Sequence, residues 1–359
     1  MYNILIWCED DLSGFGGVAA FSKLLGRELE QKGNQVSLYS KKSIYTLRQK
    51  TPLFHKQLRN IFLVPKHDFV FVQYVPYAFS SIGLPFKLVV SLWFFRLKGM
   101  QVVIFFHEVA IRSHGLSVKY QLISIFQKWI AISLNKISSL SITSNLLYAS
   151  YFGKDNNVFL NPIPSNIEEA KQPSMSQHRI TILSFVNRAF EELFEAVASL
   201  KKRGLDIQLL LVGAATEDHV ARAIRYKGSV SYPVTIYSAV SDEEMSSLLS
   251  SASIYVQLEK VSDTGEGGAS TKSGALAAAY QHGKVIITTR GDMTDERYIN
   301  EQTVFFVDGN DPLSISRGIE YIIENPEEAI LKANNARRYY YEKMDWPCLI
   351  NSLSILNKY

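Results

Sequence analysis

Two hydroxyls and an ammonium group, those of Ser270, Thr271 and Lys272, stand directly before a run of small apolar residues. The segment STKSGALAAAYQHGKVIITTRG predicts a helix over 272–282 that is followed by a strand over 284–289. A helix start carries unpaired backbone N–H groups and partial positive charge, which favours an anionic ligand such as a phosphate. In the alternative interpretation, Ser270, Thr271 or Ser273 caps the helix and Lys272 is only a solvated side chain.

A second group with binding potential is the glycine-rich turn that contains Gly14, Gly16 and Gly17. It follows the predicted strand 3–8, and glycines there allow a tight turn and close approach of a ligand to the backbone. The spacing differs from the dinucleotide-binding fingerprint, and no acid ends the next strand to hold a ribose. We therefore do not expect a nicotinamide cofactor, and a glycine turn without a ligand stays open.

His107 ends the apolar strand predicted over 101–108. Ligands of parallel α/β sheets bind at the carboxyl ends of the strands, where a histidine can donate hydrogen bonds to a sugar hydroxyl or stabilise developing charge. A structural histidine bonded to a loop carbonyl is the alternative. The sequence shows no pattern of metal ligands, so we expect no metal.

The elements that position these residues alternate between strand and helix in both halves of the chain, which predicts two Rossmann-like α/β domains in tandem with a ligand cleft between them. We expect an N-terminal acceptor domain over 1–166 and a C-terminal nucleotide-sugar domain over 174–339. A proline-containing polar linker joins them, and a helical segment over 340–359 returns to the first domain. The predicted strands are 3–8, 35–40, 69–75, 101–108, 139–144, 157–164, 180–186, 207–213, 234–240, 252–258, 284–289 and 303–308, and the predicted helices are 16–33, 84–99, 190–203, 217–226, 242–251, 272–282 and 312–324.

Charge is distributed unevenly along the 359 residues, whose net charge is +4. Residues 1–165 hold 18 Lys and Arg against 8 Asp and Glu, whereas residues 166–359 hold 20 against 26. The segment 31–67 has eight basic residues and no acid, which predicts an anionic partner such as a membrane surface or a lipid diphosphate, or else a solvated loop. Nucleic acid is disfavoured because no recognition module is present.

Two distant cysteines and the lack of a predicted leader or membrane span favour a cytoplasmic protein, with peripheral binding at the inner face of the membrane.

Taken in order, the turn GFGGV, the strand end FFHE, the segment NPIPSNI and the helix–strand pair ALAAAYQHGKVIITTRG resemble a GT-B glycosyltransferase. Family 4, the retaining enzymes of bacterial polysaccharide and glycolipid synthesis, is the most similar. The resemblance implies that Gly16 and Gly17 face the phosphates and sugar of the donor and that His107 contacts the sugar. It also implies that Arg188, in SFVNRAFEE, binds the donor diphosphate, although a loop arginine can equally be a solvated charge.

The sequence departs from that family where its glutamate pair should stand. The two positions, eight residues apart, are occupied by Ser270 and Ala278, and only Glu259 and Glu266 lie upstream. The lysine that usually follows the arginine is also replaced, by acidic and apolar residues over 191–193.

A subset of such enzymes has the pattern G-x-S-[TR]-[RK] here, which the residues GASTK over 268–272 resemble. That likeness implies that Ser270 and Thr271 hydrogen-bond the diphosphate and that Lys272 supplies the missing positive charge. Gly267 and Gly268 would let the backbone come near. We also count Glu266 and Ser273 among the candidate donor-binding residues.

The expected activity is transfer of a sugar from a nucleotide-diphosphate sugar to a polysaccharide or lipid-linked acceptor. The family resemblance implies that the transfer retains the configuration of the sugar, and we expect no cofactor. Arg188, Lys272 and backbone amides would stabilise the leaving diphosphate. Two alternatives stay open. One is a catalytically inactive GT-B subunit that binds a partner glycosyltransferase or a glycan. The other is a sugar-nucleotide epimerase, which would need more carboxylates than Glu108 and Glu266.

Overall fold

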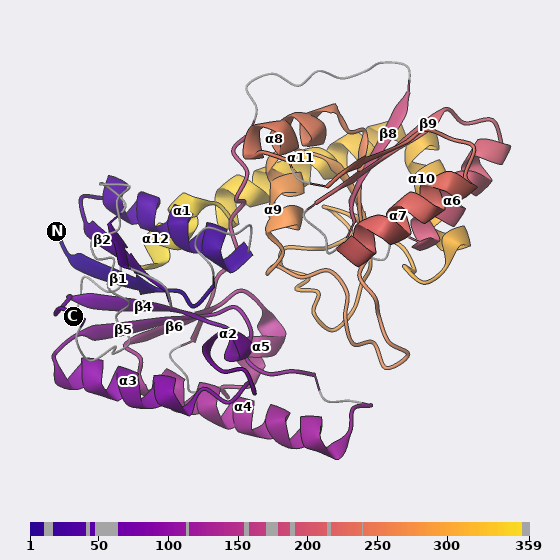
Figure 1. Cartoon of the computed structure of the whole chain (residues 1–359). Coiled ribbons are helices and arrows are strands. Elements are labelled where there is room, and N and C mark those ends of the chain that lie inside the picture. The colour runs from indigo at the N-terminus through magenta and orange to yellow at the C-terminus, as the bar shows by residue number, and fades with distance from the viewer. Residues whose placement is uncertain are drawn as a thin grey trace. The chain divides into compact units, whose positions relative to one another are not determined.

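The chain forms two compact units in a computed structural model (Figure 1). The first unit comprises Met1–Pro162 and Leu349–Tyr359, and the second comprises Ile163–Cys348. The residues that the structure describes are 1–10, 17–40, 44–46, 64–112, 115–153, 158–169, 179–186, 191–213, 217–238 and 240–353.

The first unit is built on a seven-stranded sheet in the order β3-β2-β1-β4-β5-β6-β7, parallel except for the edge pair β2–β3. Helix α1 covers one face of this sheet, whereas α3 and α4 lie together on the other (Figure 1). The described strands are β1 (Asn3–Trp7), β2 (Gln35–Tyr39), β3 (Ile44–Thr46), β4 (Phe69–Tyr74), β5 (Gln101–Phe106), β6 (Leu140–Thr143) and β7 (Val158–Leu160), and the helices are α1 (Gly17–Gln31), α2 (Pro76–Phe79), α3 (Phe86–Leu97), α4 (Val118–Ile137) and α5 (Leu146–Ser150).

No element was predicted over 118–137, where the structure has the 20-residue helix α4. One face of α4 buries Ile130, Ala131 and Leu134, but its opposite face also carries apolar side chains, among them Ile125 and Trp129. Apolar residues on both faces weaken the 3.6-residue periodicity from which a helix is predicted. Among the described helices, none is both long and apolar enough to cross a membrane.

The second unit has a six-stranded, wholly parallel sheet in the order β10-β9-β8-β11-β12-β13. Together with the first sheet, it confirms the predicted α/β class with two Rossmann-like units. The strands are β8 (Ile180–Phe185), β9 (Ile207–Val212), β10 (Val234–Tyr237), β11 (Ile254–Gln257), β12 (Val285–Thr288) and β13 (Phe305–Phe306), and the described helices are α6 (Glu191–Lys202), α7 (Glu217–Ser229), α8 (Asp242–Ser251), α9 (Gly274–Gln281), α10 (Pro312–Glu324) and α11 (Pro326–Lys343), with α12 (Trp346–Leu353) running into the first unit.

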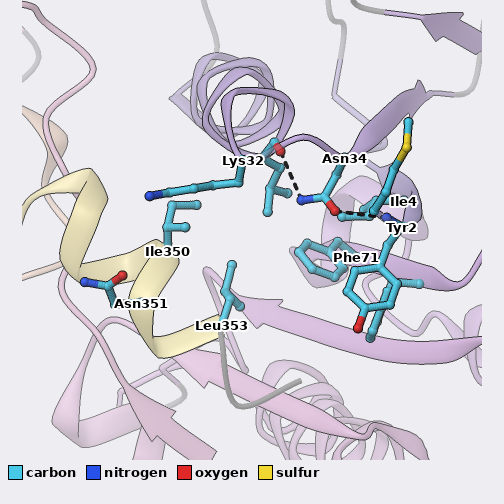
Figure 2. A pocket seen from close by; sticks show the side chains of 11 residues that line it. Tyr2, Ile4, Lys32, Asn34, Phe71, Ile350, Asn351 and Leu353 are labelled. Carbon is cyan, nitrogen blue, oxygen red and sulfur yellow. Dashed lines mark hydrogen bonds between the residues drawn. The ribbon is translucent and has the colours of Figure 1, made fainter. Parts of the chain in front are cut away.

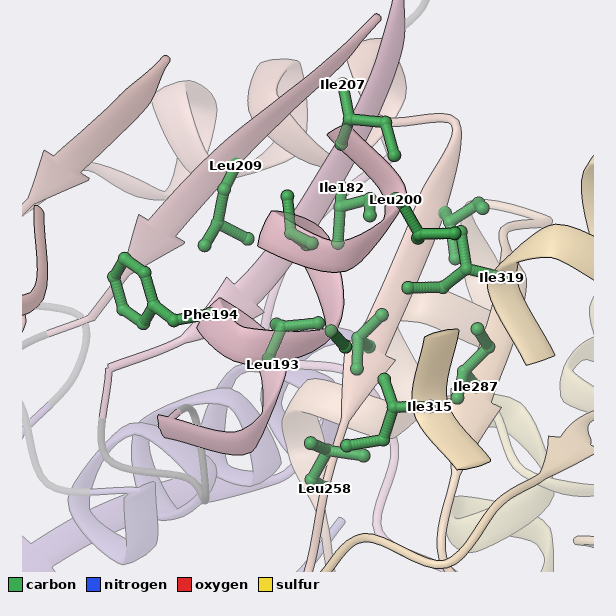
Figure 3. Packing of buried hydrophobic residues seen from close by; sticks show 14 of the residues in the cluster. Ile182, Leu193, Phe194, Leu200, Ile207, Leu209, Leu258, Ile287, Ile315 and Ile319 are labelled. Carbon is green, nitrogen blue, oxygen red and sulfur yellow. The ribbon is translucent and has the colours of Figure 1, made fainter. Parts of the chain in front are cut away.

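The core of the second unit has two layers, one on each face of its sheet. Successive residues of a strand point to opposite faces, so Ile182 joins one layer and Leu183 the other. The first layer packs β8, β9 and β12 against α6 and α10, as Leu193 and Ile319 illustrate (Figure 3). The second packs the sheet against α8 and α9, and thereby fixes the helix that carries the candidate site.

Lys284 precedes β12, and its buried ammonium group lies at the carboxyl end of α8. Its side chain is only 8% exposed, and Nζ donates to the carbonyl oxygens of Ser250 at 3.0 Å and Ala252 at 3.1 Å. Burial lowers the pKa of Lys284 from its ordinary 10.5 to about 8. The lysine therefore loses its proton in the folded protein at a lower pH than in the unfolded chain.

The pKa of Lys284 predicts a pH-dependent stability. Above pH 8 Lys284 holds its proton more fully in the unfolded chain than in the folded one, so its contribution to the free energy of unfolding should rise with pH, by about 2 kcal/mol between pH 7.5 and 9.5. Lys284→Met should lack this rise. Urea titrations of both proteins across that range measure the difference, and parallel pH profiles would contradict the prediction.

Candidate functional site

The turn before α9 holds most of the candidate residues of the second unit. Ser273, not an earlier residue, caps the helix: its Oγ accepts a hydrogen bond from the backbone N of Leu276 at 3.2 Å. The helix starts at Gly274, so the predicted start at 272 is wrong by two residues. Ser270, Thr271 and Lys272 therefore form a turn that leads into the helix rather than its first turn.

Within this turn the hydroxyl residues are buried and the lysine side chain is exposed. Thr271 is 1% exposed, and its carbonyl oxygen accepts from the N–H of Ile163 at 2.9 Å. Ser270 is also buried, and its Oγ accepts from the N–H of Lys272 at 3.3 Å. The backbone is thus held by hydrogen bonds, while Lys272 is exposed.

Gln257 links this turn to the sheet and was not predicted as a site residue. It is buried at the carboxyl end of β11, where its Oε1 accepts from Ser273 Oγ at 3.3 Å and its Nε2 donates to Glu259 Oε1 at 2.8 Å. A glutamine that ends an otherwise apolar strand is the sequence feature that could have identified it. Through Gln257, the cap of α9 and a carboxylate belong to one network.

Gly267 and Gly268 have a structural role that the sequence did not predict. Both have positive φ, +123° and +84°. A Cβ on Gly268 would lie 2.7 Å from Gly291 Cα, so the missing side chain makes room for the turn at 290–291. The space that was predicted to admit a ligand is filled by backbone there, and the donor-binding role of Gly268 stays a prediction.

Glu266 lies in the same loop. Its side chain is half-buried, and its N–H donates to Ser262 Oγ at 3.1 Å while its carbonyl oxygen accepts from the N–H of Ser262 at 2.9 Å. These bonds hold the loop backbone beside the turn at 270–273. Within the described residues, no group of three or more His, Cys, Asp or Glu side chains could hold a metal ion.

His107 of the first unit is held by a buried glutamine. It follows β5, and its Nε2 donates to Gln73 Oε1 at 2.7 Å, since an amide carbonyl can only accept. The His107 ring also packs edge-on against Phe21 of α1, with ring centroids 5.1 Å apart. Gln73 Nε2 is buried and has no hydrogen-bond partner among the described residues. Like Gln257, Gln73 is the polar residue at the end of an apolar strand, and it was not predicted.

The remaining candidates are placed only in part. Gly17 begins α1, and no other described atom lies within 4 Å of where its Cβ would be. Gly16 and Arg188 lie outside the described residues. His107 and Gly17 belong to the first unit, whereas Glu266, Gly268 and residues 270–273 are brought together in one loop of the second.

A cavity of about 310 Å³ in the first unit is lined by none of these residues (Figure 2). It opens at the amino-terminal ends of β1 and β4, the edge of the sheet opposite to His107, and Ile350 and Leu353 of α12 close one side. Its other walls are Met1, Tyr2, Ile4, Leu29, Lys32, Asn34, Phe69, Phe71 and Asn351. The lining mixes polar and apolar side chains but offers no acid or histidine, so the cavity adds nothing to the candidate chemistry.

The Gln73–His107 bond predicts a positioning effect. Gln73→Leu preserves volume but removes the acceptor that orients the imidazole. If His107 contacts the transferred sugar, the variant should lower kcat for sugar transfer by roughly 2- to 12-fold, the equivalent of one net hydrogen bond, while nucleotide affinity stays unchanged. Steady-state kinetics measure both. An unchanged kcat would show that the orientation of His107 does not matter to transfer.

Comparison with known proteins gives a family match within the second unit. Residues 167–342, just under half of the chain, match the protein-family model described as Glycosyl transferases group 1. Sucrose-phosphate synthase from Thermosynechococcus elongatus is similar in structure, with a TM-score of 0.70 at 15% identity over 100% of this chain and 98% of that one. HepE from Anabaena, solved with UDP and glucose, has a TM-score of 0.68 at 14% identity and covers 100% of both chains.

A structure described as that of an epimerase has a similar fold. A protein from Listeria monocytogenes, described as a UDP-N-acetylglucosamine 2-epimerase, has a TM-score of 0.58 at 11% identity over 92% of this chain and 90% of that one. At these identities the structures show the fold alone, which confirms the predicted GT-B architecture. No curated protein sequence matches this chain. The family match confirms the prediction of a nucleotide-sugar-dependent glycosyltransferase.

Proposed function

We propose that this chain, which has a Glycosyl transferases group 1 domain over residues 167–342, transfers a sugar from a nucleotide-diphosphate sugar to a polysaccharide or lipid-linked acceptor. We further propose that it resembles the family 4 enzymes and that the transferred sugar retains its anomeric configuration. The observation that supports it most is the turn at 270–273. Two buried hydroxyl residues and an exposed lysine there lead directly into a capped helix of that domain.

In the proposed mechanism this turn binds the donor diphosphate. The hydroxyls of Ser270 and Thr271 and the backbone N–H groups at the start of α9 donate to phosphate oxygens. Lys272 and Arg188 supply positive charge as the bond between sugar and phosphate breaks and negative charge grows on the leaving diphosphate. Each such charge-assisted contact contributes about 1.5–3 kcal/mol, so two cations and a helix start stabilise this leaving group without a cofactor.

His107 and the glycines at 16 and 17 are proposed to contact the donor sugar and its phosphates, and Glu266 to lie beside the donor. The first unit would bind the acceptor. We propose that the basic segment 31–67, most of which lies outside the described residues, attracts an anionic acceptor or membrane at the cytoplasmic inner face. Retention on anionic vesicles at low salt and release at high salt would support this electrostatic role, and equal retention on neutral vesicles would contradict it.

A screen of nucleotide sugars tests the proposed function directly. UDP-, GDP-, ADP- and CMP-sugars are added to the whole chain, and thermal unfolding is followed. A ligand at about 100 times its Kd adds about 2.7 kcal/mol, which raises Tm visibly. UDP is the first candidate because HepE was solved with it. If none of the four nucleotide classes shifts Tm, the donor assignment fails.

One observation favours an inactive subunit as the second candidate. Ser270 and the buried Ala278 stand where the family resemblance places a glutamate pair. A subunit of this kind would bind a nucleotide sugar or a glycan but would neither hydrolyse nor transfer the sugar. Donor hydrolysis by the isolated chain separates the two functions, because an active transferase slowly passes the sugar to water.

A further inference from the structure

Helix α3 carries an exposed apolar stripe on its outer side. Phe86, Val90, Trp93 and Leu97 recur at intervals of three and four residues, which places them on one face of the helix. All four are exposed; Trp93 is 58% exposed and Leu97 is 81% exposed. The opposite side of α3, with Leu88, Leu92 and Phe95, is the one buried against the first unit.

Helix α4 repeats this pattern over a greater length. Its exposed apolar residues also follow helical spacing, and among them Trp129 is 61% exposed. Helices α3 and α4 pack against each other, side by side on one face of the sheet (Figure 1). We call the combined surface the α3–α4 face; it consists of Phe86, Val90, Trp93, Leu97, Val118, Leu122, Ile125, Phe126 and Trp129.

Charge on these two helices has a single sign. Neither helix contains an acid, and Glu108 is the only acidic residue between Asp68 and Asp155 in the sequence. The five basic residues of the two helices are Lys87, Arg96, Lys119, Lys128 and Lys136. A large exposed apolar surface bordered only by positive charge is unusual for a surface that faces water alone.

We propose that the α3–α4 face lies on the surface of a bilayer that contains anionic lipid. Apolar residues, tryptophan above all, enter the boundary between headgroups and acyl chains, while lysines beside them meet the phosphates. Positive charge along both helices also disfavours a second copy of this chain, because a two-fold contact would place like charges together. The proposal goes beyond the donor site, since lipid binding requires no sugar transfer.

A vesicle assay on the full chain tests the proposal. The probes are vesicles of phosphatidylcholine alone and of phosphatidylcholine with phosphatidylglycerol, and binding is measured by co-flotation. The double variant Trp93→Ser/Trp129→Ser removes two exposed side chains and should weaken binding to the anionic vesicles by roughly tenfold or more. The matched control is Ile330→Ser/Leu331→Ser, which removes two exposed apolar side chains of α11 in the second unit and should bind as the unsubstituted chain does.

Two further readouts make the result decisive. Tryptophan emission of the unsubstituted chain should shift to shorter wavelength with anionic vesicles, and this shift should be lost in the tryptophan variant. Both variants should keep the Tm shift with nucleotide sugar, so a failure of lipid binding is distinguished from a failure of the donor site. Undiminished vesicle binding by the tryptophan variant would overturn the proposal. The proposal would also be overturned if the chain associated with itself in the absence of lipid and the tryptophan variant abolished this self-association.

Discussion

Gly268→Ala is expected to destabilise the second unit by about 2–5 kcal/mol. Gly268 has φ +84°, where an alanine costs about 1–2 kcal/mol. Its Cβ would also lie 2.7 Å from Gly291 Cα, and such overlap with backbone adds roughly 1–3 kcal/mol because neither segment can rotate away as a side chain would. The free energy of unfolding, measured by urea titration, gives the loss.

Gly265→Ala is the matched control for this prediction. Gly265 lies in the same loop with nearly the same φ, +81°, but no described atom lies within 4 Å of its Cβ position. It should therefore lose only the conformational part, about 1–2 kcal/mol. Equal losses in the two variants would show that the close approach of residues 267–268 to 290–291 is not what requires glycine.

Lys272→Ala is expected to weaken nucleotide-diphosphate binding by about 10- to 150-fold. The variant removes one charge-assisted contact, which contributes about 1.5–3 kcal/mol. The side chain is exposed, so the free energy of unfolding without ligand should change by less than about 0.5 kcal/mol. Calorimetric titration with UDP measures the affinity.

Lys260→Ala controls for the loss of positive charge as such. Lys260 is also exposed and lies in the loop that precedes the turn, so its removal changes the net charge equally. UDP affinity should change little, because an exposed cation without a contact is screened by salt. An equal loss of UDP affinity in both variants would mean that Lys272 contributes only to the overall positive charge of the loop and does not contact the diphosphate.

Helix boundaries could be predicted where a capping residue is followed directly by acids or by proline. Helices α8 and α10 have the predicted bounds, since Ser241 caps α8 and Asp311, followed by proline, caps α10. The start of α9 was misplaced because Ser270, Thr271 and Ser273 all have capping side chains. Sequence alone does not tell which hydroxyl meets the N–H three residues on.

The candidate site could be predicted residue by residue but not as a network. Hydroxyls and a lysine before a small-residue helix are visible in the sequence, as is a histidine after an apolar strand. Gln73 and Gln257 were missed because their importance depends on partners 34 and 16 residues away, His107 and Ser273. Such contacts follow from strand order and register, which local patterns do not specify.

The central claim is that a diphosphate is held by the turn at 270–273 and the start of α9. A crystal structure of the chain with UDP tests it most directly. We expect phosphate oxygens at about 3 Å from the Thr271 hydroxyl or the first N–H groups of α9, with Lys272 Nζ turned toward them. A diphosphate bound elsewhere, with Lys272 directed into solvent, would contradict the claim.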